Sequence, residues 1–371
     1  MAASVDQASL FSEDPPEPTK TDESPPESSA TPTPPSPVRV RTARRSAGVQ
    51  PADVSEEVMA VAGSLPGQLW LGTSSWTFPG WTGLVWGGQY ADAKLSKEGL
   101  AAYSRHPLLR TVSLDRAFYR PLSVSQYAHY AAQVPEHFRF VVKAPSLVAD
   151  AQVRSENGRG MTLNPAFLNA DLAVREFVAP ALEGLGPKTG ALVFQISPLP
   201  HQLLSRIPEI IDGIGVMLAA LPSLSSVAPD GLVAVEVRDA EFLSSSNGPL
   251  LVRMLREARA FNPTTYCLGL HAKMPPIEDQ LPILRALWPG PLVCRWNLHR
   301  RHGAYGYETA KQSYEPFDRI VDPDLETRHA LARVIAGTTG AKQASYVTIN
   351  NKAEGSAPLS ILELAKSLKM D

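Results

Sequence analysis

The chain has 371 residues, of which 44% are hydrophobic and 19% charged, and its formal net charge is -2. This length and apolar content suffice for a large core within one barrel domain, and the nearly balanced charge argues against a protein that coats itself with nucleic acid. The two cysteines, Cys267 and Cys294, lie in apolar runs without zinc-site spacing, which predicts buried free thiols rather than a disulfide framework.

Residues 1–65 are predicted to form a disordered tail. They include SPPESS and TPTPPSP, segments rich in Pro, Ser, Thr and Glu that bury too little apolar surface to offset their ordering entropy. A short helix within 51–64, capped by Asp53, is the one element expected there. The sequence shows neither a secretory signal nor a run of about 18 apolar residues, so we expect a cytoplasmic protein without a membrane span.

Residues 66–371 are predicted to form one TIM-type (β/α)8 parallel barrel. Short apolar runs alternate eight times with longer segments of helical period, which indicates parallel strands joined by helical crossovers. No Gly-rich phosphate loop follows the first run, which disfavours an open doubly wound sheet. The expected strands span 69–73, 111–114, 138–143, 191–196, 232–237, 266–271, 292–296 and 346–350. The expected helices span 96–104, 123–133, 165–183, 202–220, 248–260, 277–287, 322–337 and 357–368.

The side-chain alternation of these strands predicts a polar barrel mouth. Successive side chains of a strand point to opposite faces, so the side chains of alternate residues form two sets. One set, the outer parity, packs against the helices, and the other, the inner parity, fills the barrel interior. Each inner parity ends in a polar residue, and the C-terminal mouth is where ligands bind in this fold. The polar residues that end the inner parities are Ser74, Asp115, Lys143, Gln195, Arg238, His271, Arg295 and Asn350.

The first hypothesis is a mouth that binds or converts a small anionic ligand carrying a phosphate or carboxylate. Lys143, Arg238 and Arg295 would bind the anion, and Glu236 or His271 would act as general base. The alternative for the same charges is structural, with Glu236 paired to Lys143 or Arg238 to avoid an unpaired buried charge.

The second hypothesis is a metal-dependent phosphodiesterase or nuclease that binds nucleic acid, with Asp115, Glu236 and His271 as ligands. Because the sequence contains no HxH, HExxH or DxD pair at a strand end, no metal or other cofactor is predicted.

The third hypothesis is a Schiff base at Lys143, as in barrel aldolases, with the amine pKa lowered by desolvation. We favour an enzyme, and the sequence does not define its reaction class. A non-catalytic structural or interaction protein is the remaining alternative.

Aromatic residues follow the first two strands at the same mouth. They form either a stacking wall for a ring or base, or a hydrophobic lid that closes one end of the barrel. The polar segment 299–314 is a loop of the kind that gates barrels or grips phosphate. The aromatic residues are Trp76, Phe78, Trp81, Trp86, Phe118 and Tyr119.

The candidate residues follow from these patterns. The catalytic candidates are Asp115, Lys143, Glu236 and His271. The ligand-binding candidates are Ser75, Trp76, Trp81, Arg116, Tyr119, Gln195, Arg238, Arg295, Asn350 and Asn351.

Several strings resemble the YecE-like family, known as domain of unknown function 72. They are LGTSSWTFPGW (71–81), FYRP (118–121), FRFVVKAP (138–145), VAVEVRDAEF (233–242) and YVTINNKAEGSAPLSILELA (346–365). Their order and spacing extend the resemblance over nearly all of residues 68–368. The resemblance implies a TIM-type barrel and no established activity. The positions that match the family's motifs are Gly72, Ser75, Trp76, Trp81, Phe118, Tyr119, Lys143, Glu236, Arg238, Arg295, Asn350 and Asn351.

The chain departs from the family pattern at two places. Where relatives typically have Glu and then Asn in the block around the end of the second strand, this chain has Ser113 and Asp115. Where they often have Thr-His after the third strand, it has Ala149 and Asp150. If the glutamate is catalytic in relatives, this chain either uses Asp115 instead or has diverged.

Overall fold

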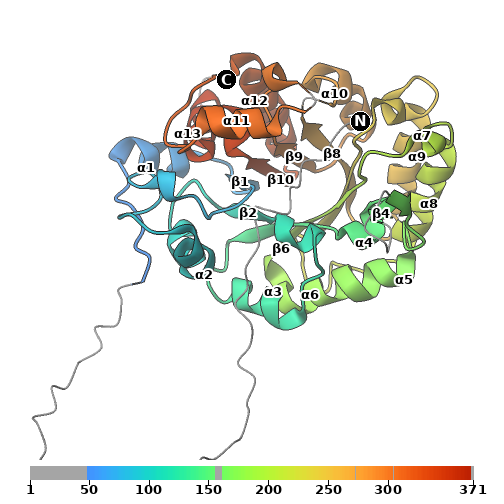
Figure 1. Ribbon diagram of the computed structural model, residues 1–371, viewed down its shortest axis with the longest axis horizontal. Helices are drawn as coiled ribbons and strands as arrows, with labels where there is room; N and C mark the ends of the chain where they lie inside the picture. The colour runs from blue at the N-terminus through green and yellow to red at the C-terminus, as the bar shows by residue number, and fades with distance from the viewer. Residues whose placement is uncertain (1–47, 155–160, 272, 304, 369–371) are drawn as a thin grey trace, which may run out of the picture. The chain divides into compact units, whose positions relative to one another are not determined.

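The computed structural model describes residues 48–154, 161–271, 273–303 and 305–368, and these belong to a compact unit that begins at Val49. Eight parallel strands close into a barrel in the order β1-β10-β9-β8-β7-β6-β3-β2, and helices surround it in chain order (Figure 1). The predicted TIM-type barrel is confirmed. Its strands are β1 (Leu69–Thr73), β2 (Thr111–Leu114), β3 (Arg139–Lys143), β6 (Thr189–Gln195), β7 (Leu232–Glu236), β8 (Thr264–Leu270), β9 (Leu292–Trp296) and β10 (Ser345–Ile349).

Each of the eight predicted helical segments overlaps a helix in the structure. The α-helices are α1 (Glu56–Gly63), α2 (Asp92–Tyr103), α3 (Val124–Ala131), α4 (Ser146–Ala149), α5 (Ala170–Ala173), α6 (Ala179–Leu185), α7 (His201–Leu204), α8 (Ile207–Ala219), α9 (Gly248–Ala258), α10 (Ile277–Ala286), α11 (Tyr307–Tyr314), α12 (Leu325–Gly340) and α13 (Ala357–Ser367). Short 3-10 helices are η2 (Pro79–Trp81), η3 (Asp115–Phe118), η5 (Gly186–Lys188), η6 (Ala240–Leu243), η7 (Arg300–His302) and η8 (Asn351–Ala353), and η4 (Val174–Val178) is a π-helix.

The barrel interior is a separate small core made by the inner parity of the strands. Trp70 stacks on Tyr346 with ring centroids 4.8 Å apart, and Tyr346 donates its hydroxyl hydrogen to the carbonyl of Asp230, just before β7. Because these rings sit at the N-terminal ends of the strands, apolar side chains fill that half of the barrel, and the polar strand ends lie at the opposite end. The interior cluster comprises Trp70, Val141, Ala191, Val193, Leu232, Ala234, Cys267, Val293 and Tyr346.

The outer parity packs beneath the helices, as predicted. Val233, Val235 and Val237 belong to the main core together with apolar residues of the surrounding helices. Both cysteines are free and buried, which confirms their prediction as buried thiols. Among the described residues, no helix combines the length and apolar character needed to pass through a membrane.

The folded unit begins earlier than the expected boundary between residues 65 and 66. Val49 is buried, and α1 packs against α13. Ser55 caps α1, since its hydroxyl accepts a hydrogen bond from the Val58 amide, so the prediction of Asp53 as the cap was wrong. The remainder of the predicted tail, up to residue 47, lies outside the described residues.

Two further elements carry no clear sequence signal. An antiparallel hairpin, β4 (Gln152–Arg154) with β5 (Met161–Leu163), follows β3. The segment 299–314, expected as a loop, contains η7 and α11. In α11 the buried residues are Ala310 and Tyr314, and this sparse apolar pattern explains why the helical period was not recognised.

Candidate functional site at the barrel mouth

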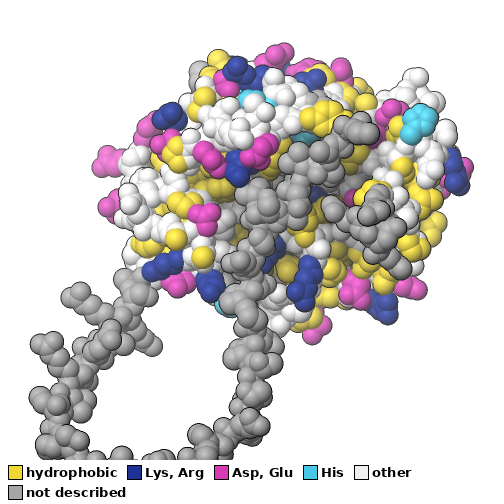
Figure 2. All heavy atoms as spheres, viewed as in Figure 1, with side chains coloured by type: hydrophobic (Ala, Val, Ile, Leu, Met, Phe, Trp, Pro, Cys, Tyr) yellow, Lys and Arg dark blue, Asp and Glu magenta, His cyan; other side chains and the backbone are white. Residues whose placement is uncertain are grey.

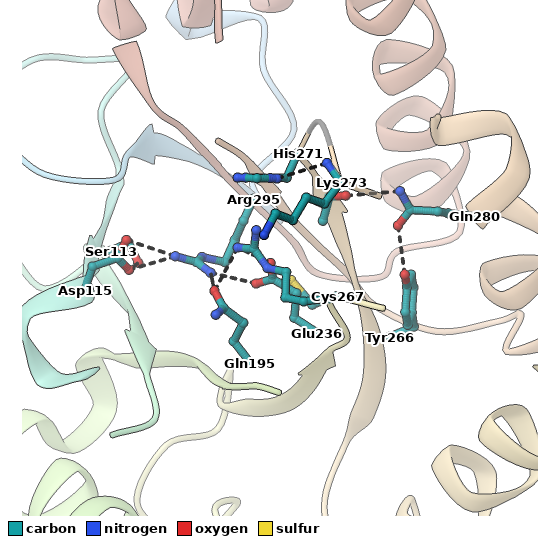
Figure 3. Close-up of polar contacts among 12 residues, drawn as sticks. Ser113, Asp115, Gln195, Glu236, Tyr266, Cys267, His271, Lys273, Gln280 and Arg295 are labelled. Atoms are coloured by element: carbon teal, nitrogen blue, oxygen red, sulfur yellow. Dashed lines mark hydrogen bonds and ion pairs between the residues drawn. The ribbon is translucent and has the colours of Figure 1, made fainter. Parts of the chain in front are cut away.

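Arg295 on β9 lies at the centre of the polar mouth (Figure 3). Its Nη1 donates to Glu236 Oε2 at 2.6 Å and to Gln195 Oε1 at 2.9 Å, and its Nη2 donates to the two Asp115 carboxylate oxygens at 3.0 and 2.9 Å. Burial alone would lower the pKa of Arg295, but Asp115 and Glu236 outweigh it and raise that pKa. The guanidinium is therefore always charged and joins groups from β6, β7 and the end of β2.

Glu236 is completely buried at the end of β7 and serves two arginines. Arg238 Nη2 lies 2.7 Å from Glu236 Oε1, an ion pair not aligned as a hydrogen bond, and donates to Gln195 Oε1 at 2.8 Å. Burial would raise the pKa of Glu236, but Arg238 and Arg295 lower it overall. Both carboxylate oxygens are thus committed to guanidinium groups, which favours an anchoring role for Glu236 over that of general base.

A glycine in the next strand makes room for this carboxylate. Gly269 on β8 is paired in register with Arg295, and a Cβ at this position would lie 3.1 Å from Glu236 Oε1. A contact of this length is tight for a side chain, so the missing methyl group lets the buried ion pairs form inside the barrel.

Lys143 at the end of β3 differs from the two arginines. It is half-buried, and its Nζ lies 3.5 Å from the centroid of the Phe118 ring, a cation–π contact. The ammonium has no hydrogen bond or ion pair with any residue in the described ranges. Burial, followed by the positive charge of Arg295, lowers the pKa of Lys143 to about 7.

The mouth carries an excess of positive charge when Lys143 is protonated. Lys143, Arg238 and Arg295 face the two carboxylates of Asp115 and Glu236, which leaves one positive charge unbalanced. Arg238 is 11% exposed, and within the described structure its Nη1 has no hydrogen-bond acceptor. Two cationic donors, Lys143 Nζ and Arg238 Nη1, are thus left for an external acceptor.

Neutral polar groups complete the rim. Asn350 Nδ2 donates to Ser74 Oγ at 2.8 Å and more weakly to the Tyr307 hydroxyl at 3.4 Å. Burial, followed by the charge of Asp115, raises the pKa of Tyr307 to about 12, so this residue is a neutral phenol. Ser113 Oγ donates to Asp115 Oδ1 at 2.6 Å, which fixes the carboxylate facing Arg295. Tyr307 was not among the candidates, because α11 was not predicted.

Two further predicted residues lie at the edge of the mouth. His271 is half-buried at the end of β8, where burial, followed by the charge of Arg238, lowers its pKa to about 4. It is therefore neutral near pH 7, and its Nδ1 accepts a hydrogen bond from the Lys273 amide at 3.2 Å. Arg116 donates to the Tyr130 hydroxyl of α3 at 2.7 Å, so this guanidinium is held by the helix rather than by the Arg295 network. Tyr119 is exposed.

The tryptophans after β1 belong to the main hydrophobic core of the protein. Trp76, Trp81 and Trp86 are buried, and Trp76 Nε1 donates to the Leu95 carbonyl of α2 at 3.0 Å. Rings buried in this way present no face on which a planar ligand could stack.

Ser75 and Asn351 serve local structure. Asn351 Oδ1 accepts from Trp81 Nε1 at 3.2 Å and from the Ala357 amide at the start of α13 at 2.8 Å. The Ser75 carbonyl accepts from Thr73 Oγ1 at 2.7 Å. Neither residue hydrogen-bonds to the Arg295 network within the described residues.

The geometry provides no ligand set for the metal-ion hypothesis. The described part of the chain contains no group of three His, Cys, Asp or Glu side chains that could hold a metal ion. The Arg295 guanidinium lies between Asp115 and Glu236 and bonds to both, so these carboxylates are already neutralised by an organic cation.

The visible edge of one face offers no sign of a nucleic-acid interface. On the face shown in Figure 2, basic and acidic side chains of the described residues intermingle around the edge. Such mixing provides no continuous basic track for a phosphate backbone along that edge.

The fold and the mouth define a TIM-type barrel protein with an arginine-centred polar site. Residues 70–371 match the family model described as "Protein of unknown function DUF72", and the chain belongs to this family. The resemblance to domain of unknown function 72 is confirmed.

A solved structure with a TM-score above 0.5 gives the same fold assignment. A DUF72 family protein from Enterococcus faecalis is 17% identical, with a TM-score of 0.51 over 82% of this chain and 96% of that one. A DUF72 family protein from Thermotoga maritima is 17% identical over 81% of this chain and 99% of that one, with a TM-score of 0.47. None of the curated proteins matches the sequence.

Proposed function

We propose that the barrel mouth binds a small anionic ligand, through a carboxylate or phosphate group held by Lys143 Nζ and Arg238 Nη1. The observation that carries this proposal is the unpaired ammonium of Lys143. A lysine in an enclosed site is normally paired with a carboxylate or neutralised, because an isolated charge in such a site is costly. An anionic ligand supplies the missing partner.

The contacts made by the two terminal nitrogens of Arg295 support this division of roles. All its Nη contacts go to Glu236, Gln195 and Asp115, so Arg295 organises the mouth and adds to its positive field. Arg238 and Lys143 each retain a donor that has no acceptor among the described residues. Hydrogen bonds between charged partners are about twice as strong as neutral ones, so two such contacts select for an anion.

Ligand charge and the Lys143 pKa are linked in this proposal. A bound anion stabilises the ammonium form, so binding raises the pKa of Lys143 above its ligand-free value of about 7. Binding at a pH below this value requires no proton uptake and is tightest there.

Isothermal titration calorimetry with inorganic phosphate and, separately, L-lactate tests the proposal at about pH 6.5, where an amine of pKa about 7 is mostly protonated. The wild type is compared with Lys143→Met and with Lys97→Met, a control on the exposed side of α2. We expect at least one of the two anions to bind, with affinity about tenfold or more weaker in Lys143→Met and unchanged in Lys97→Met. Failure of both anions to bind wild type, or equal affinity in Lys143→Met, would contradict the proposal.

A further inference from the structure

We infer that Lys143 is a nucleophile that forms an imine with the carbonyl group of a small oxo acid bound at the mouth. The inference rests on the proposed function, because the acid group of the substrate occupies the same anion site. It adds the substrate class, a 2-oxo acid, and a covalent step.

The position of Lys143 is suited to attack on a bound ligand. Its side chain has the inner parity of β3, at the C-terminal end of the strand, and is half-buried. Phe118 covers one side of the amine at 3.5 Å, and no carboxylate oxygen of the described residues lies within 4.0 Å of Nζ. The nitrogen is therefore held in place without a hydrogen bond that would occupy its lone pair once the proton is lost.

The other enclosed lysines lack this combination. Lys188 donates to the carbonyls of Ala131 and Val134 at 2.9 and 2.8 Å, which ties its ammonium to backbone. Lys352 is 4% exposed, and its Nζ lies 4.1 Å from the centroid of the Tyr307 ring. Burial lowers the pKa of Lys352 to about 8, but this residue is almost completely buried beside the Tyr307 and Phe317 rings.

The step needs no reagent other than one proton from solvent. The neutral Lys143 amine attacks the carbonyl carbon, the C=O π bond breaks, and a proton passes from nitrogen to oxygen to give a neutral carbinolamine. The hydroxyl group then takes up one proton from solvent and leaves as water, the C=N bond forms, and the nitrogen keeps its remaining proton as a protonated imine. The substrate carboxylate is held by Arg238 Nη1, and the cationic imine keeps the charge that the ammonium had.

The protonation state of the amine suits this chemistry near neutral pH. In the ligand-free site, with a pKa of about 7, about half of Lys143 is the free amine at pH 7, against under one part in a thousand for an ordinary lysine. The substrate carboxylate lowers this fraction when it binds, and attack proceeds through the free amine that remains. Burial is the main cause of the low ligand-free pKa, and the fixed positive charges of Arg295 and, less strongly, Arg238 add to it against the opposing charge of Asp115.

Borohydride trapping with glyoxylate and with pyruvate tests the inference on the full chain. Borohydride reduces an imine to a stable secondary amine, which peptide mapping by mass spectrometry locates. With at least one of the two oxo acids we expect one adduct per chain, on Lys143, and none on Lys352. Lys143→Arg should abolish that adduct, Lys97→Met should retain it, and excess L-lactate should reduce its yield by competing for the anion site.

The calorimetric titration separates failure of this inference from failure of the proposed function. L-lactate has an acid group but no carbonyl, so it reports on the anion site alone. Lactate or phosphate binding that depends on Lys143, without an adduct on Lys143 from either oxo acid, would overturn the imine while leaving the anion site intact. Adducts distributed over exposed lysines such as Lys97, without enrichment at Lys143, would overturn it equally.

Discussion

Replacing Lys143 with methionine is expected to stabilise the protein while weakening anion binding. The pKa of Lys143 falls from 10.5 to about 7 on folding, so protonated Lys143 destabilises the fold. One pKa unit corresponds to about 1.4 kcal/mol, which gives an upper bound of about 5 kcal/mol. Because the side chain is only half-buried and water screens part of the effect, we expect Lys143→Met to raise the free energy of unfolding by about 1–3 kcal/mol near pH 6.

The stability difference between Lys143→Met and wild type should decrease as the pH rises. Below about pH 7 the amine is protonated in both the folded and unfolded chains, and the full penalty is present. Between about pH 7 and 10.5 the unfolded chain binds more protons, so wild-type stability rises with pH and the advantage of Lys143→Met declines. Urea denaturation of both proteins from about pH 6 to 9.5 measures this difference in the free energy of unfolding. A methionine variant that is less stable than wild type at pH 6, or a difference independent of pH, would refute the reasoning.

The remaining predictions concern the ion pairs and the anion site. Arg295→Met removes the guanidinium that donates to the buried Glu236 Oε2 and pairs with Asp115, and it should cost about 3–5 kcal/mol. Arg295→Met combined with Glu236→Gln should cost less than the sum of the two single changes. Additive urea-denaturation values would contradict this coupling. Gly269→Ala should lower the free energy of unfolding by about 1–3 kcal/mol, because the alanine Cβ would lie 3.1 Å from Glu236 Oε1. An unchanged melting temperature would show that the Glu236 carboxylate can move away from the added methyl group. Above about pH 7 the wild-type affinity for phosphate, corrected for the ionisation of phosphate itself, should fall by up to about tenfold per pH unit, because Lys143 loses its proton. The affinity of Lys143→Arg should not change with pH over this range. Calorimetric affinities that fall equally in both proteins would argue against contact between the ligand and the lysine.

Strand alternation made the barrel and its polar mouth predictable. Inner residues such as Ala234 and Cys267 are confirmed in the interior cluster, and outer ones such as Val233 in the main core. The prediction succeeded because the two faces of each strand carry different residues, although both faces are buried. Small or polar residues face the barrel interior, and branched apolar residues face the helices.

Other features depend on distant contacts that a single sequence does not reveal. Asn351 matched a polar position after the last strand, but its side chain binds the Trp81 indole, 270 residues away in the chain. Tyr307 reaches the rim from α11, whose largely polar sequence gave no helical signal. The pairing of Arg295 with both Asp115 and Glu236 likewise required the closed barrel, since the sequence allowed several partners for each charge.

Trace acetylation of Lys143 as a function of pH tests the central claim most directly. The rate of acetylation follows the free-amine fraction, and peptide mass spectrometry assigns it to each lysine, with exposed Lys97 as internal reference. An unpaired and partly desolvated ammonium predicts a titration midpoint for Lys143 near pH 7, which moves upward when the anion that binds in calorimetry is added. A midpoint near the ordinary lysine value of about 10.4, unmoved by that anion, would contradict an unpaired charge awaiting an anionic partner at the barrel mouth.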